Sequence, residues 1–530
     1  MNNLPAHSPV IIVGAGPSGL MMAAQLLRFG IQPVIIEAKT ALNTESRALA
    51  VQARSLEIFR QMGLDKVALD QGNVAKGLEL YQDTERIADI ELSSLGEGIS
   101  FFPFALILEQ SKTERILVDY LTGNACPIYW DTQVLGLYQT DKVVSVKVKR
   151  SAGEEIISCD WLIGADGAGS KVRKSLNISF SGGTYENKFF LADMKIAGEK
   201  STDYIRVFLK DKGFTGIFPM KDSSYRFIGT IPAALQAKPD ISFDDLRPYL
   251  TYDLGFSLEG DRCNWFSTYQ LHHRMAEKFR NQRCFLIGDA AHIHSPAGGQ
   301  GMNTGLQDAY NLAWKLAGVI KNRYPDSILN TYAEERMPVA KTLLKTTDRL
   351  FGIGIGQTWL IRKLRRWFLP LILNRIRKTE RISRQLFGVI SQTGISYRNG
   401  SLSVHHGGSK AVRAGDRLPF IKFFDEKLKQ ETDLHAWCAQ TGFTLIVIGN
   451  LGQRDILAIA KWIKLSYPLD LNFFYLPYSE RNQPLFDCFE MNETSKKAIV
   501  VRPDMHIGYI NDVVDVELLA GYFQEIVRWK

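Results

Sequence analysis

The stretch VIIVGAGPSG at residues 10–19 decides the fold. It joins a β-branched run, typical of a strand buried in a parallel sheet, to a Gly-x-Gly-x-x-Gly pattern at Gly14, Gly16 and Gly19. An apolar helical stretch follows as far as Leu27. In such a unit the first glycine allows a tight turn, the second lets a pyrophosphate approach the backbone, and the third lets helix and strand pack closely. The stretch therefore predicts an α/β domain that places a phosphate at a helix N-terminus.

A second strand, predicted at residues 33–36, ends at Glu37 and Ala38. A carboxylate at this point can accept hydrogen bonds from the ribose hydroxyls of an adenine dinucleotide. The alternative is a glycine turn in an α/β unit that binds no nucleotide. Strand, helix and distal glutamate together favour the dinucleotide, but this fingerprint alone does not separate FAD from NAD.

Length, charge and cysteine usage exclude several classes of protein. The chain has 530 residues, which predicts about three folding units. Its net charge of +8 comes from 64 basic and 56 acidic residues spread along the chain, so a dedicated nucleic-acid interface is not expected. The six cysteines form no Cys-x-x-Cys pair, which argues against a disulfide framework and against a metal site, and favours a reducing, cytoplasmic location. Residues 9–27 carry no charge, but their glycines favour strand, turn and helix over a transmembrane span.

Two later segments repeat the pattern of a buried strand followed by a polar turn. Residues 160–173 read DWLIGADGAGSKVR, and residues 283–292 read RCFLIGDAAH. The second is followed by SPAGGQGMN at residues 295–303 and by an amphipathic helix to about Ile320. A carboxylate at a strand end, followed by glycines at a helix start, suits a hydroxylated and partly anionic ligand.

These three motifs, in this order, resemble the class A flavoprotein monooxygenases, the aromatic hydroxylases that include the phenol, p-hydroxybenzoate and aromatic polyketide hydroxylases. The resemblance covers most of residues 8–345. It implies an α/β fold with a Rossmann-like FAD-binding domain of the glutathione-reductase type, an inserted antiparallel-sheet substrate domain, a helical segment and a C-terminal thioredoxin-like domain. We expect the first part of the FAD domain at residues 1–180, the substrate sheet at 181–280, the return to the FAD domain with its helices at 281–400, and the C-terminal domain at 401–530.

The resemblance assigns cofactor contacts residue by residue. The residues expected to hold the ADP half of FAD are Gly14, Ala15, Gly16, Pro17, Ser18, Gly19, Glu37 and Ala38. Asp289 is expected to bond the ribityl chain, and Asp166 to serve flavin and NADPH handling. Those expected at the isoalloxazine are Arg47, Gln110, Pro296, Gly299, Gly301, Met302 and Asn303. Arg47, on a segment that would border the active site, is also expected to be a catalytic residue, and the alternative for Gln110 is an ordinary polar residue at a helix start. Backbone N–H groups at that helix start would stabilise the negative charge of reduced flavin.

Substrate contacts are expected from the alternating strand-like runs between residues 180 and 280. In the family such a sheet covers the flavin, so the candidates to line an aromatic pocket are Phe218, Tyr225, Phe227 and Tyr269; the alternative for each is ordinary core packing. His294 is the first candidate for a general base that would make a phenolate, with His292 or no base as alternatives. Residues 48–50 lack the carboxylate that phenol hydroxylases carry near this point.

The remainder of the chain carries weaker signals. Residues 359–378 interleave Arg and Lys with large apolar residues, which favours helix packing within the protein over a membrane-surface helix. Residues 401–413 are a predicted linker, and strands are predicted at 443–448 and 498–509. Cys438 and Cys488 form no dithiol motif, so a structural or dimerisation role is expected of the last domain.

The resemblance implies an FAD-dependent, NAD(P)H-consuming hydroxylase in which a C4a-hydroperoxyflavin passes oxygen from O2 to an activated aromatic ring. With one glycine fingerprint, NADPH or NADH is expected to bind transiently, without its own Rossmann domain. The Trp-x-Trp-x-Ile-Pro signature of tryptophan halogenases is absent. Baeyer–Villiger oxygenation in the same site, and a non-catalytic flavin- or ligand-binding protein that protects a pathway intermediate, remain alternatives. A homodimer is compatible with the sequence.

Overall fold

The computed structural model describes residues 3–43, 48–196, 203–210, 213–256, 258, 262–295, 299–355, 375, 379–468 and 470–530, with only the helical backbone described for 347–355. Arg47, Pro296 and all but one residue of the predicted basic helix at 359–378 therefore lie outside the described residues.

A parallel sheet is built around the first motif. The strand order is β17-β18-β11-β1-β2-β8, with β9 and β10 attached beside β11. β1, β2, β8, β11 and β18 run parallel, and β17 runs antiparallel to β18. The strands of this sheet are β1 (His7–Val13), β2 (Val34–Ile36), β8 (Ile128–Tyr129), β9 (Gln133–Gln139), β10 (Val144–Arg150), β11 (Gly153–Gly164), β17 (Arg280–Asn281) and β18 (Cys284–Leu286).

Three helices carry the sequence motifs against this sheet. They are α1 (Pro17–Arg28), α5 (Gln110–Gly123) and α8 (Gly301–Ile320). α1 packs against both α5 and α8. Its residues 19–26 are all buried, as are residues 303–318 of α8, so both helices are covered on every side and lie at the centre of the main core.

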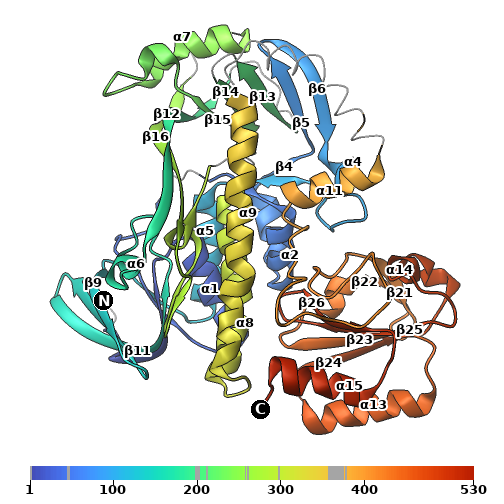
Figure 1. The fold of residues 1–530 in the computed structure, drawn as a ribbon. Coiled ribbons are helices and arrows are strands. Elements are labelled where there is room, and N and C mark those ends of the chain that lie inside the picture. Colours follow the sequence, from blue (N-terminus) through green and yellow to red (C-terminus); the bar gives the residue numbers. More distant parts are fainter. Residues whose placement is uncertain are drawn as a thin grey trace.

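A second sheet lies above the first and is joined to it by long strands (Figure 1). Its order is β19-β16-β12-β15-β14-β13-β5-β6. We expected it to be antiparallel, but β13 pairs with β5 in parallel, so the sheet is mixed. β5 and β6 also precede residue 181, where we expected this sheet to begin. Its strands are β5 (Gly77–Gln82), β6 (Glu85–Glu91), β12 (Phe180–Lys195), β13 (Tyr204–Lys210), β14 (Gly213–Pro219), β15 (Ser224–Thr230), β16 (Cys263–Ala276) and β19 (His292–Ile293).

One face of the second sheet is covered by α7 (Phe243–Leu254). Ser242 and Asp245 form a reciprocal capping box that starts this helix. Near the opposite face lies a small third sheet of order β3-β7-β4. The remaining short elements of this half are β3 (Ala50–Val51), β4 (Asn73–Ala75), β7 (Ala105–Ile107), α2 (Ala53–Gln61), α3 (Asp65–Gln71), α4 (Leu92–Gly96) and α6 (Lys171–Ser175).

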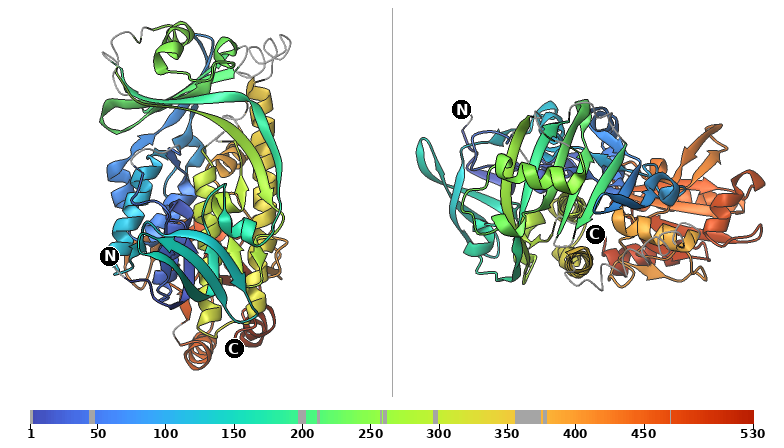
Figure 2. Two further views of the ribbon diagram at one scale, coloured as in Figure 1. Left: turned by 90° about the vertical axis from the view of Figure 1, so that its left-hand side faces the viewer. Right: turned by 90° about the horizontal axis from the view of Figure 1, so that it is seen from above.

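The long helix α9 (Asn330–Ile355) runs from α8 up to strands of the second sheet (Figure 1). α11 (Glu380–Ile390) packs against α4. The C-terminal domain lies to one side of α8 and α9, as both the front view and the view from above show (Figure 2).

The C-terminal domain has a five-stranded sheet of order β20-β26-β25-β23-β24. β23 pairs in parallel with β24 and antiparallel with β25. The single strand predicted at 498–509 is two strands, because the chain turns at Met505, whose φ is 63°. Its elements are β20 (Val404–His405), β21 (Lys422–Asp425), β22 (Gln430–Asp433), β23 (Phe443–Gly449), β24 (Leu471–Leu476), β25 (Lys496–Val501), β26 (Ile507–Asn511), α12 (Leu434–Trp437), α13 (Gln453–Ser466), α14 (Gln483–Cys488) and α15 (Val516–Gly521).

Among the described residues, no helix combines the length and the apolar character that crossing a bilayer requires.

Candidate functional site

The glycine turn between β1 and α1 leaves open space in front of a helix N-terminus. Gly14 has φ 107°, and a Cβ on it would lie 2.4 Å from the Ala165 carbonyl oxygen. A Cβ on Gly19 would lie 2.0 Å from the Gly14 carbonyl oxygen, so turn and helix touch. By contrast, no atom lies within 4 Å of the position that a Cβ on Gly16 would take. Helix α1 begins after Gly16 with Pro17 and no side-chain cap, so its first N–H groups are available to a phosphate.

Glu37 lies directly beside this turn. Its Oε2 accepts a hydrogen bond of 2.7 Å from the Ala15 N–H, and its Oε1 accepts one of 3.0 Å from the Lys39 N–H. The Glu37 N–H itself donates to the Tyr129 carbonyl, which fixes the residue at the end of β2. The half-buried carboxylate is thus held where the ribose next to a bound pyrophosphate is expected, and Ala38 beside it is exposed.

Asp289 follows β18 at the same edge of the sheet. Its side chain is solvent-accessible, although the strand before it and the residues on either side are buried. The surrounding protein raises the pKa of its carboxyl by desolvation, an effect that His292 partly opposes. A carboxyl deep in the fold that faces open space is a fitting partner for ligand hydroxyl groups.

Ser18 connects the glycine turn to α8. A Cβ on Gly288 would lie 2.3 Å, and a Cβ on Gly305 2.2 Å, from the Ser18 hydroxyl oxygen. Only glycine at both positions allows α1, the turn at Asp289 and α8 to approach this closely. The side chain of Ser18 therefore points at these glycines, and its contribution to a bound phosphate would come from its backbone.

The N-terminus of α8 is fixed by Asn303. Its Oδ1 accepts a 2.9 Å hydrogen bond from the Gln52 N–H, and its Nδ2 donates to the carbonyls of Ala50 and Gly299 at 2.8 Å each. α8 has no side-chain N-cap, so its first N–H groups, near Gly301 and Met302, are available to a group that carries negative charge.

The two candidate histidines are in different situations. His292 is 2% exposed, and its Nε2 lies 2.7 Å from Asp308 Oδ2. Asp308 also accepts a 2.7 Å hydrogen bond from Arg336. Burial by itself would raise the pKa of Asp308, but His292 and Arg336 hold it below its ordinary value. His292 is therefore part of a buried charge cluster, whereas His294 is half-buried and lies 3.5 Å from the position of a Cβ on Gly301.

Gln110 and Asp166 make contacts within the protein. The Gln110 side chain donates a 2.7 Å hydrogen bond to Glu114, and its N–H donates to the Ala48 carbonyl, which places the start of α5 beside residues 48–50. Asp166 accepts hydrogen bonds from the Ser170 hydroxyl at 2.5 Å and the Lys171 N–H at 2.6 Å. The carboxylate of Asp166 thus supports the start of α6.

The four aromatic candidates of the second sheet divide between its two faces. Tyr225 is 1% exposed and Phe227 0% exposed, and both lie in the cluster under α7. Phe218 points the other way and packs against a small cluster that includes Leu49 of the segment before β3. Tyr269 is half-buried, and its ring lies 6.0 Å from that of Phe189 in a separate cluster. Of the four, the structure brings Phe218 next to the segments that precede α2.

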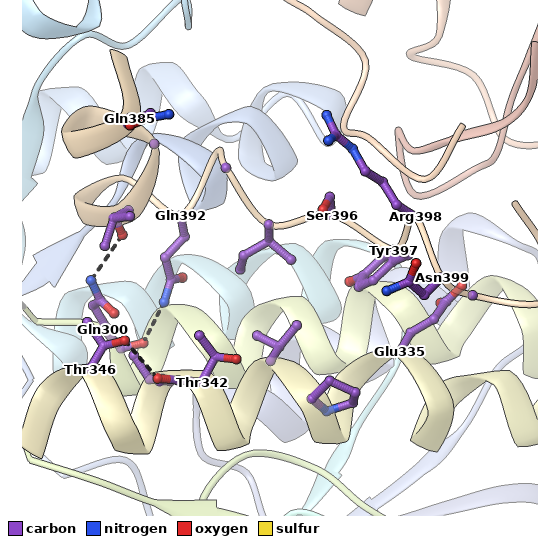
Figure 3. A pocket seen from close by; sticks show the side chains of 18 of the residues that line it. Gln300, Glu335, Thr342, Thr346, Gln385, Gln392, Ser396, Tyr397, Arg398 and Asn399 are labelled. Carbon is purple, nitrogen blue, oxygen red and sulfur yellow. Dashed lines mark hydrogen bonds between the residues drawn. The ribbon is translucent and has the colours of Figure 1, made fainter. Parts of the chain in front are cut away.

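Sequence reasoning missed a group of polar residues behind the first turn of α8. Gln392 donates a 2.9 Å hydrogen bond to the Thr304 hydroxyl and accepts one of 2.6 Å from Gln307. Gln300 and Gln392 line a cavity of about 1150 Å³ between α9, α11 and residues 394–400 (Figure 3). Apart from Gln300, this cavity lies away from the strand ends described above. No local motif marks Gln392, because its partners are distant in the sequence.

The residues at the strand ends fit FAD. The space at Gly16 suits a pyrophosphate, Glu37 a ribose, Asp289 a ribityl chain, and the uncapped N-terminus of α8 the electron-rich edge of a flavin ring. Among the described residues, no group of three or more His, Cys, Asp or Glu side chains could hold a metal ion.

Comparisons with known proteins point to the same ligand. Residues 7–347 match the family model of the FAD binding domain. The chain is 35% identical over 339 residues to the 6-methylpretetramide 4-monooxygenase of Streptomyces rimosus. The matched residues cover 64% of this chain and 60% of that protein. It is 32% identical over 526 residues to a flavin-dependent monooxygenase of Mycobacteroides abscessus. This match covers 95% of this chain and 97% of that protein. The solved structure of an anhydrotetracycline hydroxylase from Streptomyces rimosus superposes with a TM-score of 0.78, 25% identity, and coverage of 98% of this chain and 99% of that one.

Proposed function

We propose that this chain, which belongs to the flavin-dependent monooxygenases with an FAD-binding domain, hydroxylates an aromatic compound of the phenolic or polyketide class. The cofactor is FAD. We propose NADPH or NADH as the electron donor and O2 as the co-substrate. The observation that carries the proposal is the convergence of Glu37, Asp289 and the uncapped N-terminus of α8 at one edge of the parallel sheet. The names of two compared proteins, for a pretetramide and an anhydrotetracycline, support a polyketide-like substrate.

The residues that would hold FAD divide by the part of the cofactor they face. Bound FAD would supply electron transfer from NAD(P)H to O2 and delivery of one oxygen atom to the ring. The set proposed for the ADP half is Gly14, Ala15, Gly16, Pro17, Ser18, Gly19, Glu37 and Ala38. The set proposed for the ribityl chain and the flavin ring is Arg47, Gln110, Asp166, Asp289, Pro296, Gly299, Gly301, Met302 and Asn303.

The protein's own contribution is charge stabilisation and exclusion of water. N–H groups at the start of α8 favour negative charge beside them, so they would make reduction of a flavin bound at this place easier. Asn303, with no exposed surface, holds that turn against Ala50 and Gln52. Phe218 packs against the apolar cluster of Leu49, Ala75, Ile107 and Met220, which would help to exclude water from this side of the site.

His294 is the residue that we propose to take a proton from a phenolic substrate. Its ring lies beside Gly301 at the start of α8, whereas the Nε2 of His292 is engaged with Asp308. Imidazoles titrate near neutral pH, as a general base requires. Replacement by Gln, which keeps a polar side chain, should lower the rate of hydroxylation and flatten its rise with pH, while flavin reduction by NADPH in the absence of substrate stays as in the wild type.

For the C-terminal domain we propose a thioredoxin-like fold without dithiol chemistry. The order of its elements, β23-α13-β24-α14-β25-β26-α15, with β25 antiparallel to β23, supports this assignment. Burial raises the pKa of the Cys438 thiol to about 12 and that of Cys488 to about 11, so neither would be a thiolate at neutral pH. Trapping with an alkylating reagent at pH 7 should leave both thiols unmodified.

The deciding experiment is anaerobic stopped-flow reduction of the bound FAD by NADPH or NADH, with a panel of phenols, naphthoquinols and anthracyclinone-like polyketides. One compound should accelerate reduction, and admission of O2 should then give a product heavier by one oxygen atom. Structure determination of the product separates ring hydroxylation from oxygen insertion beside a ketone. Absence of reduction with every ligand, despite bound FAD, would contradict the proposal and favour a ligand-binding role.

Three further expectations stay proposals with their own tests. Light scattering tests the homodimer, cell fractionation tests the cytoplasmic location, and limited proteolysis tests the domain boundaries near residues 180, 280 and 400.

A further inference from the structure

Gln392 combines a strained backbone with a buried side chain. Its φ is 61°, in the left-handed region that residues other than glycine seldom adopt, and it is 4% exposed. It follows the end of α11, where Ser391 and Thr393 share a hydrogen bond of 2.9 Å. A residue held in this conformation persists only where its surroundings fix it, and such residues cluster at functional sites.

Both ends of the Gln392 amide bond to α8. Its Nε2 donates hydrogen bonds of 2.9 Å to the Thr304 hydroxyl and 3.4 Å to the Gln300 carbonyl. Its Oε1 accepts a hydrogen bond of 2.6 Å from Gln307 Nε2. Thr304 links Gln392 to the residue before α8, because the Thr304 hydroxyl donates a hydrogen bond of 2.9 Å to the Gln300 carbonyl. Figure 3 shows the Gln392 side chain reaching from its loop toward the segment that carries Gln300.

These bonds add to those that Asn303 makes at the start of α8. Asn303 ties the first turn to Ala50 and Gln52, and Gln392 ties the same turn to the segment after α11. The Gln300 side chain adds a 3.1 Å hydrogen bond to the Val389 carbonyl. A turn whose N–H groups are to stabilise charge needs to be held in place by several such bonds, since a helix end that shifts or frays loses its alignment with the ligand.

We propose that Gln392 is a positioning residue that fixes the first turn of α8 and thereby raises the reduction potential of the bound flavin. The inference rests on the proposed function, because it needs FAD at the start of α8. Gln392 would act on the flavin through Thr304 and Gln300, to which its amide bonds. Only a side chain with both a donor and an acceptor can make these contacts, so an apolar residue of similar size cannot replace it.

Two substitutions separate the amide from the backbone. Gln392→Gly removes the side chain at a φ that glycine adopts without strain, so the fold should tolerate it. Gln392→Met keeps the volume and the strain but removes the hydrogen bonds. The matched control is Gln282→Gly, because Gln282 has φ 50° and an exposed side chain at the β17–β18 turn.

The measurement is the equilibrium between oxidised and reduced flavin against a reference dye, without substrate. Both Gln392 variants should still bind FAD. Their ratio of reduced to oxidised flavin should be roughly tenfold lower than in the wild type, which lowers the reduction potential by about 30 mV for a two-electron couple. Gln282→Gly should match the wild type. If neither Gln392 variant yields folded protein, Thr304→Val, which removes the hydroxyl that Gln392 contacts, should show the same shift.

An unchanged ratio in both Gln392 variants would overturn the inference and leave the proposed function intact. A shift in Gln392→Met alone would also overturn it, since the effect would then come from packing. A wild-type chain that binds no FAD would overturn the proposed function and this inference together.

Discussion

Glu335 of α9 and Arg502 after β25 form a bidentate ion pair, with hydrogen bonds of 2.6 and 2.9 Å and no exposed surface on either side chain. Lys315 of α8 donates to the same carboxylate at 2.7 Å. Burial would raise the pKa of Glu335, but Arg502 and Lys315 lower it to about 2. This cluster joins the FAD-binding domain to the C-terminal domain through fully buried charges.

Removal of Arg502 should therefore destabilise the whole chain. Arg502→Met leaves the carboxylates of Glu335 and Asp504 buried with fewer partners. Removal of one partner from a buried ion pair lowers the free energy of unfolding by about 3–5 kcal/mol. Arg398→Met is the control, since Arg398 also makes a bidentate pair, with Asp416, but its side chain is 44% exposed, and such a pair contributes about 0–1 kcal/mol. Urea unfolding of both variants gives the comparison, and equal costs would contradict the importance of the buried cluster.

A second buried contact predicts sensitivity to mild acid. His435 is 4% exposed and lies between Arg417 and the Leu418 carbonyl. Burial is the main cause that lowers its pKa to about 4, and Arg417 adds to it, while Glu57 opposes it. Since the folded pKa is below the ordinary value, the folded chain binds fewer protons between pH 6.5 and 4. The stabilisation is complete above pH 6.5 and is lost as the pH falls toward 4.

We expect His435→Gln to remove roughly 2 kcal/mol of the difference in unfolding free energy between pH 7 and pH 4. Denaturant titrations at the two pH values measure it. His7→Gln is the control, because His7 is exposed at the start of β1, where its ring contacts the Ser158 hydroxyl and the exposed Asp160. A wild-type chain as stable at pH 4 as at pH 7 would show that His435 does not act in this way.

Substitution of Asp289 should have opposite effects on the stability of the FAD-free chain and on its affinity for FAD. Its pKa is raised, so the carboxyl favours folding below its ordinary pKa, and that contribution is lost as the pH rises through the folded value. Asp289→Asn should therefore stabilise the FAD-free chain at pH 7. It should also weaken FAD binding by roughly tenfold or more, because a charged hydrogen bond to the ribityl chain is lost.

Fluorescence titration with FAD and thermal unfolding of the FAD-free chain test the two effects separately. Asp166→Asn provides the comparison, since the Asp166 carboxylate supports α6 through Ser170 and Lys171. The Asp166→Asn substitution should reduce the free energy of unfolding by more than it reduces the free energy of FAD binding. An Asp289→Asn chain that binds FAD as tightly as the wild type would remove Asp289 from the proposed site.

The geometry of the glycine turn, where we propose that the phosphates bind, was predictable because its determinants are local. Gly14, Gly16 and Gly19 stand within one turn, and the strand before them and Glu37 after them follow from short apolar runs. The same holds for the start of α8, where glycines follow β18, which ends at Leu286. In these places residue type and backbone geometry are tied within a few positions.

The parts that sequence reasoning missed depend on contacts between distant segments. Asp308, Arg336 and His292 form one cluster from two helices and a strand. Gln392 bonds to Thr304 across 88 residues of sequence. Such pairs leave no periodic signal in one sequence, and the parallel pairing of β5 with β13 is hidden for the same reason.

The face of each aromatic residue in the second sheet was also beyond a single sequence. Alternation assigns Tyr225 and Phe227 to one face of their strand, but it does not say which face α7 covers. That depends on where α7 docks, and the structure places both residues under it, while Phe218 packs toward Leu49.

This division predicts different outcomes for two phenylalanine truncations. Phe218→Ala should weaken binding of an aromatic substrate several-fold with a small change in stability, because the side chain is half-buried between the sheet and the segment before β3. Phe227→Ala should cost about 3–5 kcal/mol of unfolding free energy, since Phe227 has no exposed surface, and leave substrate affinity unchanged in the folded fraction. Substrate titration followed by flavin absorbance, together with urea unfolding, measures both quantities. Weaker substrate binding in Phe227→Ala than in Phe218→Ala would place the substrate on the α7 side of the sheet instead.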